Sequence, residues 1–195
     1  MIVDYGMGNL RNVRRAFDQL THDVLVTDDI KIIASADKLV LPGVGAFGEA
    51  VKRIDSLGFR KPLVKHVEDN RPLLGICLGM QLLFERSEES PGTLGLGLLK
   101  GEIKKFGGGV KVPHIGWNDV VPAGSSVLLG TNGSSACFYF VHSYYLPDSP
   151  ATVATSTYGV RFSSAVQWEN IFGVQFHPEK SQTAGAQLIR HFVEL

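Results

Sequence analysis

The first half of the chain alternates short apolar runs with segments of helical periodicity, and this alternation restricts the possible fold more than any other feature. The apolar runs predict strands at residues 1–5, 23–26, 38–41 and 73–76. Apolar residues at helical spacing predict helices at about residues 10–20, with Asn9 as the cap, 46–56, 60–70 and 78–86. Strands that alternate with helices form a parallel sheet with helices on both faces.

The second half, from Gly95 on, is rich in Gly, Pro, Val, Thr and aromatic residues and predicts further strands at residues 103–106, 120–121, 138–145, 152–157, 165–168 and 172–176. Glu169 and Asn170 form a predicted hairpin turn, and a last helix spans about residues 183–194, capped by Ser181 or Thr183. We therefore predict a three-layer α/β fold with a mixed, mainly parallel central sheet, helices on both faces and antiparallel extensions, in one domain over residues 1–195.

Composition limits the function classes. The 195 residues are 44% hydrophobic and carry 19 basic and 19 acidic side chains, so the charge balances and nothing indicates a nucleic-acid surface. No apolar run approaches the roughly 20 residues that span a bilayer. Two cysteines and no signal peptide indicate reduced thiols in a cytoplasmic protein. A chain without net charge also lacks strong repulsion against a protein partner.

One cysteine lies at the junction of a predicted strand and helix, in Gly75-Ile76-Cys77-Leu78-Gly79. Small residues around a nucleophile in that setting are typical of a nucleophile elbow, a sharp turn that lifts the side chain above the sheet edge. The helix N-terminus favours the thiolate, and the backbone N–H of Leu78 becomes half of an oxyanion hole. A small buried core cysteine is the alternative, and the elbow context argues against it.

A thiolate nucleophile needs a base and a group that orients the base, and the segment Phe176-His177-Pro178-Glu179 contains both. Pro178 keeps His177 out of the helical region, and residues two apart in an extended segment face the same way. His177 and Glu179 can therefore present an imidazole and a carboxylate on one side of the chain. The alternative is a chance pair on a solvated loop.

The segment Pro42-Gly43-Val44-Gly45 ends another predicted strand. Its glycines permit a backbone that turns an N–H inward, so Gly43, Val44 and Gly45 are candidates for the other half of the oxyanion hole. An ordinary strand-to-helix turn is the alternative reading.

Other patterns carry little weight. Gly6 and Gly8 begin like a dinucleotide-binding fingerprint, but Arg11 stands where a third glycine is needed. The six histidines lack metal-ligand spacing. Cys137 lies in an aromatic, strand-like run and is expected in the core. We expect neither a cofactor nor a metal ion.

Residues 75–81 (GICLGMQ) and 176–179 (FHPE) together resemble the class I, or triad, glutamine amidotransferases. Four more segments resemble those members of the family that act as glutaminase subunits in histidine biosynthesis: residues 4–9 (DYGMGN), 41–48 (LPGVGAFG), 113–118 (PHIGWN) and 138–144 (FYFVHSY). The resemblance covers essentially the whole chain, in order.

This resemblance implies a role for each matching residue. Cys77 attacks the side-chain amide of L-glutamine, His177 carries the thiol proton to the leaving ammonia, and Glu179 orients His177. Water then hydrolyses the glutamyl thioester. One side chain and three backbone positions bind the amino-acid end of the substrate: Gln81, His142, Ser143 and Tyr144. An exposed Gln81 and a merely buried, satisfied His142 ring are the alternatives.

The resemblance also implies a partner, a (β/α)8-barrel cyclase subunit that receives the ammonia through a tunnel and makes imidazole glycerol phosphate and an aminoimidazole carboxamide ribotide. The implied docking residues are Asn9, Asn12, Trp117, Tyr139 and Lys180. Three alternatives are a glutaminase for another ammonia acceptor, a catalytically silent binding module and a free-standing cysteine hydrolase. The segments 41–48 and 113–118 argue against the first, and the intact Cys77, His177 and Glu179 argue against the second.

Overall fold

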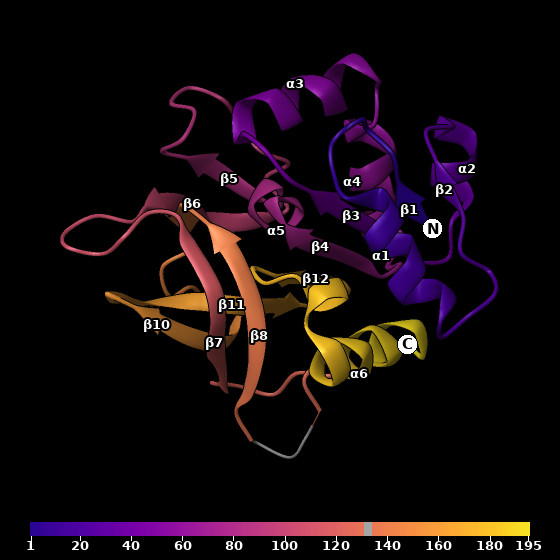
Figure 1. Cartoon of the computed structure of the whole chain (residues 1–195). Helices are drawn as coiled ribbons and strands as arrows, with labels where there is room; N and C mark the ends of the chain where they lie inside the picture. Colours follow the sequence, from indigo (N-terminus) through magenta and orange to yellow (C-terminus); the bar gives the residue numbers. More distant parts are fainter. Residues whose placement is uncertain (131–133) are drawn as a thin grey trace.

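The computed structural model describes residues 1–130 and 134–195 and confirms the α/β class (Figure 1). Its nine-stranded sheet is mixed, with the order β2-β1-β3-β4-β12-β11-β10-β7-β8. The parallel half contains β1 (Ile2–Val3), β2 (Val26–Thr27), β3 (Leu39–Gly43), β4 (Leu73–Cys77) and β12 (Ile171–Val174). The antiparallel half contains β11 (Val160–Trp168), β10 (Thr152–Tyr158), β7 (His114–Pro122) and β8 (Ala136–His142).

A smaller sheet lies beside the main one and contains β5 (Phe84–Ser87), β6 (Leu99–Lys105) and β9 (Tyr144–Tyr145). β9 follows β8 after a single residue, Ser143, so the chain passes from the large sheet to the small one at that point. This crossing brings the backbone of Ser143 and Tyr144 to the place where the two sheets meet.

Helices cover both faces of the parallel half, as Figure 1 shows. One layer holds α2 (Ile30–Ser35), α3 (Phe47–Ser56), α4 (Arg60–Glu68) and α5 (Leu78–Leu82), and the other holds α1 (Leu10–Asp18) and α6 (Gln182–Val193). Because alternate strand residues point to opposite faces, Leu39 and Leu41 pack in the first core and Val40 in the second. The sheet thus separates two apolar layers.

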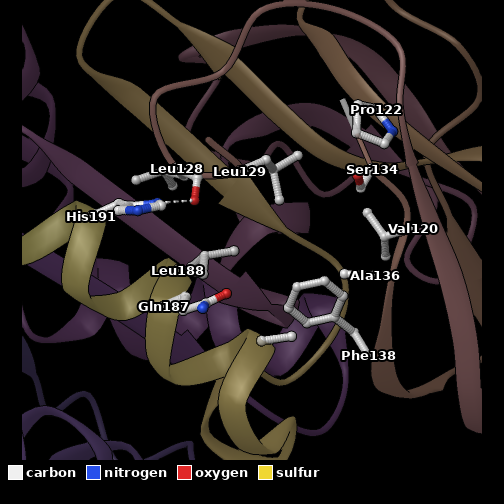
Figure 2. Close-up of a pocket in the computed structure, with 11 residues that line it drawn as sticks. Val120, Pro122, Leu128, Leu129, Ser134, Ala136, Phe138, Gln187, Leu188 and His191 are labelled. Atoms are coloured by element: carbon white, nitrogen blue, oxygen red, sulfur yellow. Dashed lines mark hydrogen bonds between the residues drawn. The ribbon is translucent and has the colours of Figure 1, made fainter. Parts of the chain in front are cut away.

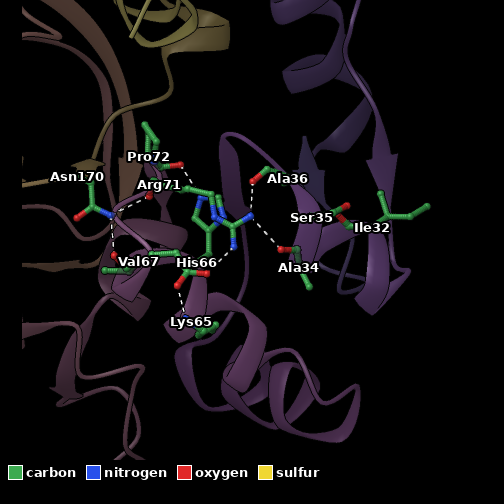
Figure 3. A network of polar contacts seen from close by, with 11 residues as sticks. Ile32, Ala34, Ser35, Ala36, Lys65, His66, Val67, Arg71, Pro72 and Asn170 are labelled. Carbon is green, nitrogen blue, oxygen red and sulfur yellow. Dashed lines mark hydrogen bonds and ion pairs between the residues drawn. The ribbon is translucent and has the colours of Figure 1, made fainter.

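Away from the strand ends that hold Cys77, polar contacts join helices to the loops that connect the strands. His191 on α6 lies 2.8 Å from the Leu128 carbonyl, close to Leu188 (Figure 2). Just before β4, the Arg71 side chain donates hydrogen bonds to the carbonyls of Ala34 and Ala36, and the Asn170 side-chain amide donates to the backbone carbonyl of Arg71 (Figure 3). Among the described residues, no helix has the length and apolarity needed to cross a bilayer.

Several local predictions agree with the structure. The Asn9 side chain accepts the Asn12 N–H at 3.4 Å and caps α1. Glu169, with φ +51°, lies in the turn between the antiparallel strands β11 and β12. Ser181 occupies the N-cap position of α6, although its hydroxyl bonds to the carbonyl of His177 instead of capping the helix.

Others were wrong. The helix predicted at residues 78–86 ends at Leu82, because the carbonyls of Leu82, Leu83 and Glu85 accept hydrogen bonds from a later segment, residues 95–99, and the chain continues as β5. The helix α2, which Asp29 caps, was missed, and the strand predicted at residues 23–26 is the two-residue β2.

Cys137 is exposed instead of buried. Strand alternation in β8 sends Phe138 and Phe140 into the core and leaves Cys137 on the outer side.

Candidate active site

Cys77 occupies a strained turn between β4 and α5. Its backbone has φ +54° and ψ −109°, values that a non-glycine residue rarely adopts. The turn is tight because α5 packs directly on the neighbouring strand: a Cβ atom on Gly79 would lie 1.8 Å from the Leu41 carbonyl oxygen. Only glycine fits there, so the elbow that the sequence predicts is present.

The parallel strands bring the site together at their carboxyl ends. Gly43, the last residue of β3, pairs with Cys77, the last residue of β4. β12 lies on the other side of β4 and pairs Val174 with Ile76, so the chain that leaves β12 reaches His177 beside the elbow. Residues that are far apart in sequence thus meet at one sheet edge, where ligands of open parallel sheets bind.

His177 and Glu179 form a buried pair. Nδ1 of His177 lies 2.8 Å from Oε1 of Glu179, and their side chains are 3% and 1% exposed. His177 is extended, with φ −103° and ψ 94°, as the following proline predicts, whereas Glu179 lies in a short 3-10 turn, η1 (Pro178–Lys180). The turn, and not an extended chain, therefore places the carboxylate on Nδ1 and leaves Nε2 for other groups.

The electrostatics of this pair favour the imidazolium. Burial alone lowers the pKa of His177, but the nearby Cys77 sulfur and the Glu179 carboxylate outweigh burial and raise this pKa to about 10. Within the described part of the chain, His177 Nε2 and Glu179 Oε2 are buried atoms without a hydrogen-bond partner. The Nε2–H of an imidazolium at this position is therefore available to a thiolate and to a substrate in the same cavity.

A cavity of about 360 Å³ surrounds Cys77, large enough for an amino-acid substrate. Most of its lining was predicted from the sequence: Val44, Gly45, Cys77, Leu78, Gln81, His142, Ser143, Tyr144 and His177. Gly43 and Glu179 stand behind this lining, in β3 and behind His177.

Gln81 and His142, for which the sequence left a second interpretation open, are both buried. The Gln81 side chain is not an exposed helix position, because Nε2 donates to the Tyr144 carbonyl at 3.1 Å and to Oε1 of Gln175 at 2.9 Å. The His142 ring bonds to the Tyr144 carbonyl at 2.7 Å and to His114 at 2.9 Å. Burial lowers the pKa of His142 to about 3, so its ring is a neutral, satisfied group.

The predicted docking residues fall into two groups beside the site. Lys180 Nζ lies 5.5 Å from the centre of the Tyr139 ring, and Trp117 lies 6.2 Å from the same ring. Asn9 and Asn12 lie at the start of α1, and Asn12 shares a hollow with Glu179. Lys180 and both asparagines are exposed, Trp117 is 48% exposed, and Tyr139 is half-buried.

Three residues near the nucleophile were missed. Glu89 lines the cavity and accepts the Phe47 N–H, the Tyr5 hydroxyl is buried below Gly43, and Gln175 contacts the Cys77 sulfur. Of these, Gln175 alone left a sequence signal, a polar residue in an apolar strand. In residues 1–130 and 134–195, the His, Cys, Asp and Glu side chains form no cluster that could hold a metal ion.

Fold and site thus have the form of a cysteine hydrolase in which a thiol, an imidazole and a carboxylate share one sheet edge. The family described as "Glutamine amidotransferase class-I" matches residues 1–195. Solved structures share the fold. One described as a glutamine amidotransferase has a TM-score of 0.77 at 22% identity, with 99% of this chain and 97% of that chain covered. PurLQS from Thermotoga maritima has a TM-score of 0.73 at 19% identity, with 99% and 96% covered.

Similarity to curated proteins identifies a narrower group within this family. The chain is 47% identical to "Imidazole glycerol phosphate synthase subunit HisH" of Methanothermobacter thermautotrophicus, over 100% of this chain and 97% of that protein. It is 45% identical to the protein of the same description from Aquifex aeolicus, over 98% and 94%. The chain therefore belongs to the class I glutamine amidotransferases and, within them, to the family of HisH subunits, which confirms the resemblance in its motifs.

Proposed function

We propose that this chain hydrolyses L-glutamine to L-glutamate and ammonia, and that the ammonia passes to the cyclase subunit of an imidazole glycerol phosphate synthase in L-histidine biosynthesis. The observation that carries the proposal is the placement of Cys77, on a strained elbow, in one cavity with His177. The identity of 47% to a full-length HisH subunit supports the acceptor.

In the first half-reaction the Cys77 thiolate attacks the side-chain carbonyl carbon of glutamine. Negative charge then develops on the amide oxygen, and backbone N–H groups of Leu78 and of the Gly43–Gly45 segment stabilise it. The imidazolium of His177 gives its Nε2 proton to the leaving nitrogen, and ammonia departs from a glutamyl thioester. Glu179 holds the imidazole so that Nε2 faces the sulfur.

In the second half-reaction the same imidazole, now neutral, removes a proton from water. The water attacks the thioester, the Cys77 thiolate leaves, and glutamate is released. Because His177 donates a proton in one step and accepts one in the next, both its imidazolium and its neutral form must be accessible in the same site.

The amino-acid end of the substrate lies toward Gln81 and the segment His142–Tyr144. Both amide hydrogens of Gln81 are used within the protein, so its carbonyl oxygen is the group left for the substrate ammonium. The carboxylate of Glu89 lines the same cavity and adds negative charge there. The backbone at Ser143 and Tyr144 then binds the carboxylate of the substrate.

The partner in this proposal is a (β/α)8-barrel cyclase that docks on Asn9, Asn12, Trp117, Tyr139 and Lys180. The Tyr139 carbonyl accepts the backbone N–H of His177 at 2.9 Å, so this surface is joined directly to the base. We place the complex in the cytoplasm, where the two free thiols stay reduced.

The test is steady-state production of glutamate from glutamine by the chain together with its cyclase. We expect Cys77→Ser to abolish turnover, because a serine hydroxyl is far less acidic than a thiol. Cys137→Ser, on the exposed side of β8, is the matched control and should leave turnover intact. Turnover by Cys77→Ser within a few-fold of the wild type would reject Cys77 as nucleophile.

A further inference from the structure

Gln175 is a buried amide beside the nucleophile that none of these steps uses. It follows β12 directly, its side chain is fully buried, and its backbone N–H donates to the Ser164 carbonyl at 2.9 Å. Its side-chain Nε2 lies 3.7 Å from Sγ of Cys77, within reach of an N–H···S hydrogen bond. Gln175 and His177 are two residues apart and both face the thiol.

The hydrogen-bond network fixes which end of the Gln175 amide faces the sulfur. A backbone carbonyl only accepts, so the Gln81 atom 3.1 Å from the Tyr144 carbonyl is the NH2 group. This same NH2 group lies 2.9 Å from Gln175, so the Gln175 atom facing it is the oxygen. The NH2 group of Gln175 therefore points at Cys77.

The thiolate needs such a donor in this structure. The helix that follows Cys77 has five residues instead of the nine predicted, so few peptide dipoles align behind the sulfur. The sulfur is also buried, and a buried charge is costly without hydrogen bonds. A hydrogen bond to a charged group is stronger than one between neutral groups.

We propose that Gln175 is a further catalytic residue, which donates its Nε2–H to the Cys77 sulfur and stabilises the thiolate before attack and on departure from the thioester. This inference rests on the proposed function, in which Cys77 is the nucleophile. The chain Tyr144–Gln81–Gln175–Cys77 also links the residue that meets the substrate to the nucleophile, so the amide is held without help from the ligand.

The first test measures the thiol without substrate. In a Cys137→Ser background, which leaves Cys77 as the single cysteine, the rate of alkylation by iodoacetamide is measured against pH. Gln175→Met removes the N–H donor while keeping a side chain of similar length. Gln175→Asn keeps the amide but shortens the side chain by one methylene, which moves the donor away from the sulfur. We expect both to move the midpoint of the profile to higher pH by about one unit, since a hydrogen bond to a charge is worth roughly a tenfold or larger factor.

The second test measures turnover in the complex with the cyclase. Both variants should lower kcat about 10- to 100-fold. The control Gln167→Met removes a glutamine amide from the neighbouring strand β11, where it accepts the Val127 N–H, and should change neither readout. In wild-type protein, the NMR signal of the Gln175 side-chain amide should also shift when Cys77 is alkylated, a measurement that does not depend on how the variants fold.

The outcomes separate the two claims. The role of Gln175 would be overturned if folded Gln175→Met had the wild-type kcat and alkylation profile, or if the Gln175 amide signal did not change when Cys77 is alkylated. Neither result would contradict the glutaminase activity. A wild-type complex that does not hydrolyse glutamine would instead reject the proposed function, while the alkylation profiles and the amide signal still report on the hydrogen bond.

Discussion

Oε1 of Glu179 lies 2.8 Å from Nδ1 of His177, and both side chains are almost completely buried. Because this carboxylate fixes the imidazole and helps to raise the pKa of His177 to about 10, the pair controls both the direction and the acidity of Nε2–H. In the proposed mechanism the buried carboxylate thus acts through His177, without lining the cavity itself.

Replacement of Glu179 by glutamine should keep the contact and remove the charge. We expect kcat to fall roughly 100-fold or more, the scale of a general acid–base contribution. The pKa of His177 should drop, so the basic limb of the pH–rate profile should move to lower pH. Glu194→Gln, at the exposed end of α6, is the control. An unchanged basic limb in Glu179→Gln would show that the carboxylate does not tune the base.

Gly43 and Gly45, the two glycines of the segment proposed to form part of the oxyanion hole, should respond differently to alanine. A Cβ on Gly43 would lie 2.6 Å from the Tyr5 hydroxyl and 2.9 Å from the Gly79 backbone nitrogen, so Gly43→Ala should lower both the melting temperature and the turnover. Gly45 has φ +100°, and its added Cβ would approach the flexible end of Met7.

Gly45→Ala should therefore alter the backbone more than the packing. Because φ +100° strains any side chain, we expect the melting temperature to fall, though less than in Gly43→Ala. We expect kcat to fall toward the 100-fold or greater loss of an oxyanion-hole donor, about 3 kcal/mol. Thermal unfolding and steady-state kinetics on the same sample separate the effects. Turnover within a few-fold of the wild type would remove Gly45 from the mechanism.

Much of this site was accessible from sequence because its signals are local. The glycines around Cys77 indicate a crowded backbone at the elbow, and Pro178 indicates that His177 is extended. Glu89 gave no such signal, and Gln175 gave only that of a polar residue in an apolar run, since their contacts are with residues about forty and about a hundred positions away in the sequence.

The errors in the fold have the same cause. The helix after Cys77 was predicted too long because helical periodicity does not show that residues 95–99 take up the carbonyls of Leu82 and Glu85. Cys137 was placed in the core because an aromatic run does not show which residues of β8 face inward.

The cyclase should activate the glutaminase. Free ammonia protonates in water and is lost as a nucleophile, so hydrolysis without an acceptor wastes glutamine. The carbonyl of Tyr139, in the proposed docking surface, accepts the backbone N–H of His177. We expect the rate to rise on adding the cyclase and again on adding its nucleotide ligand, by a factor typical of coupled sites, roughly 5- to 150-fold.

Lys180→Ala, which removes the cation from the Tyr139 ring, should reduce this activation, whereas Lys61→Ala, on the exposed side of α4, should not. Equal activation of both variants would remove Lys180 from the coupling. Full activity of the isolated chain, unchanged by partner and ligand, would contradict the coupling itself.

The free energy of unfolding should depend on pH in two separate windows. Burial holds the pKa of His142 near 3, below the unfolded value of 6.5, so protons bind the unfolded state first and stability falls as pH drops below 6.5. From pH 6.5 to 5 this histidine alone accounts for about 2 kcal/mol. Burial also lowers the pKa of His66 and of His114, in the same direction.

His177 acts in the opposite sense. Its folded pKa of about 10 lies above the unfolded value, so its contribution is complete below pH 6.5 and is lost as pH rises toward 10. Urea unfolding at several pH values should therefore give maximal stability near pH 6.5, where the two windows meet, and Glu179→Gln should weaken only the alkaline loss. A stability that stays flat from pH 6.5 to 5 would contradict the buried neutral histidines.

The most direct measurement of the central claim is peptide mass spectrometry after treatment with a glutamine-mimicking electrophile, with and without an excess of L-glutamine. Cys77 is the buried thiol in the cavity, and Cys137 is the exposed thiol outside it. We predict one adduct, on Cys77, that L-glutamine suppresses. An adduct confined to Cys137, or labelling of Cys77 that L-glutamine does not reduce, would contradict a glutamine-hydrolysing site at this elbow.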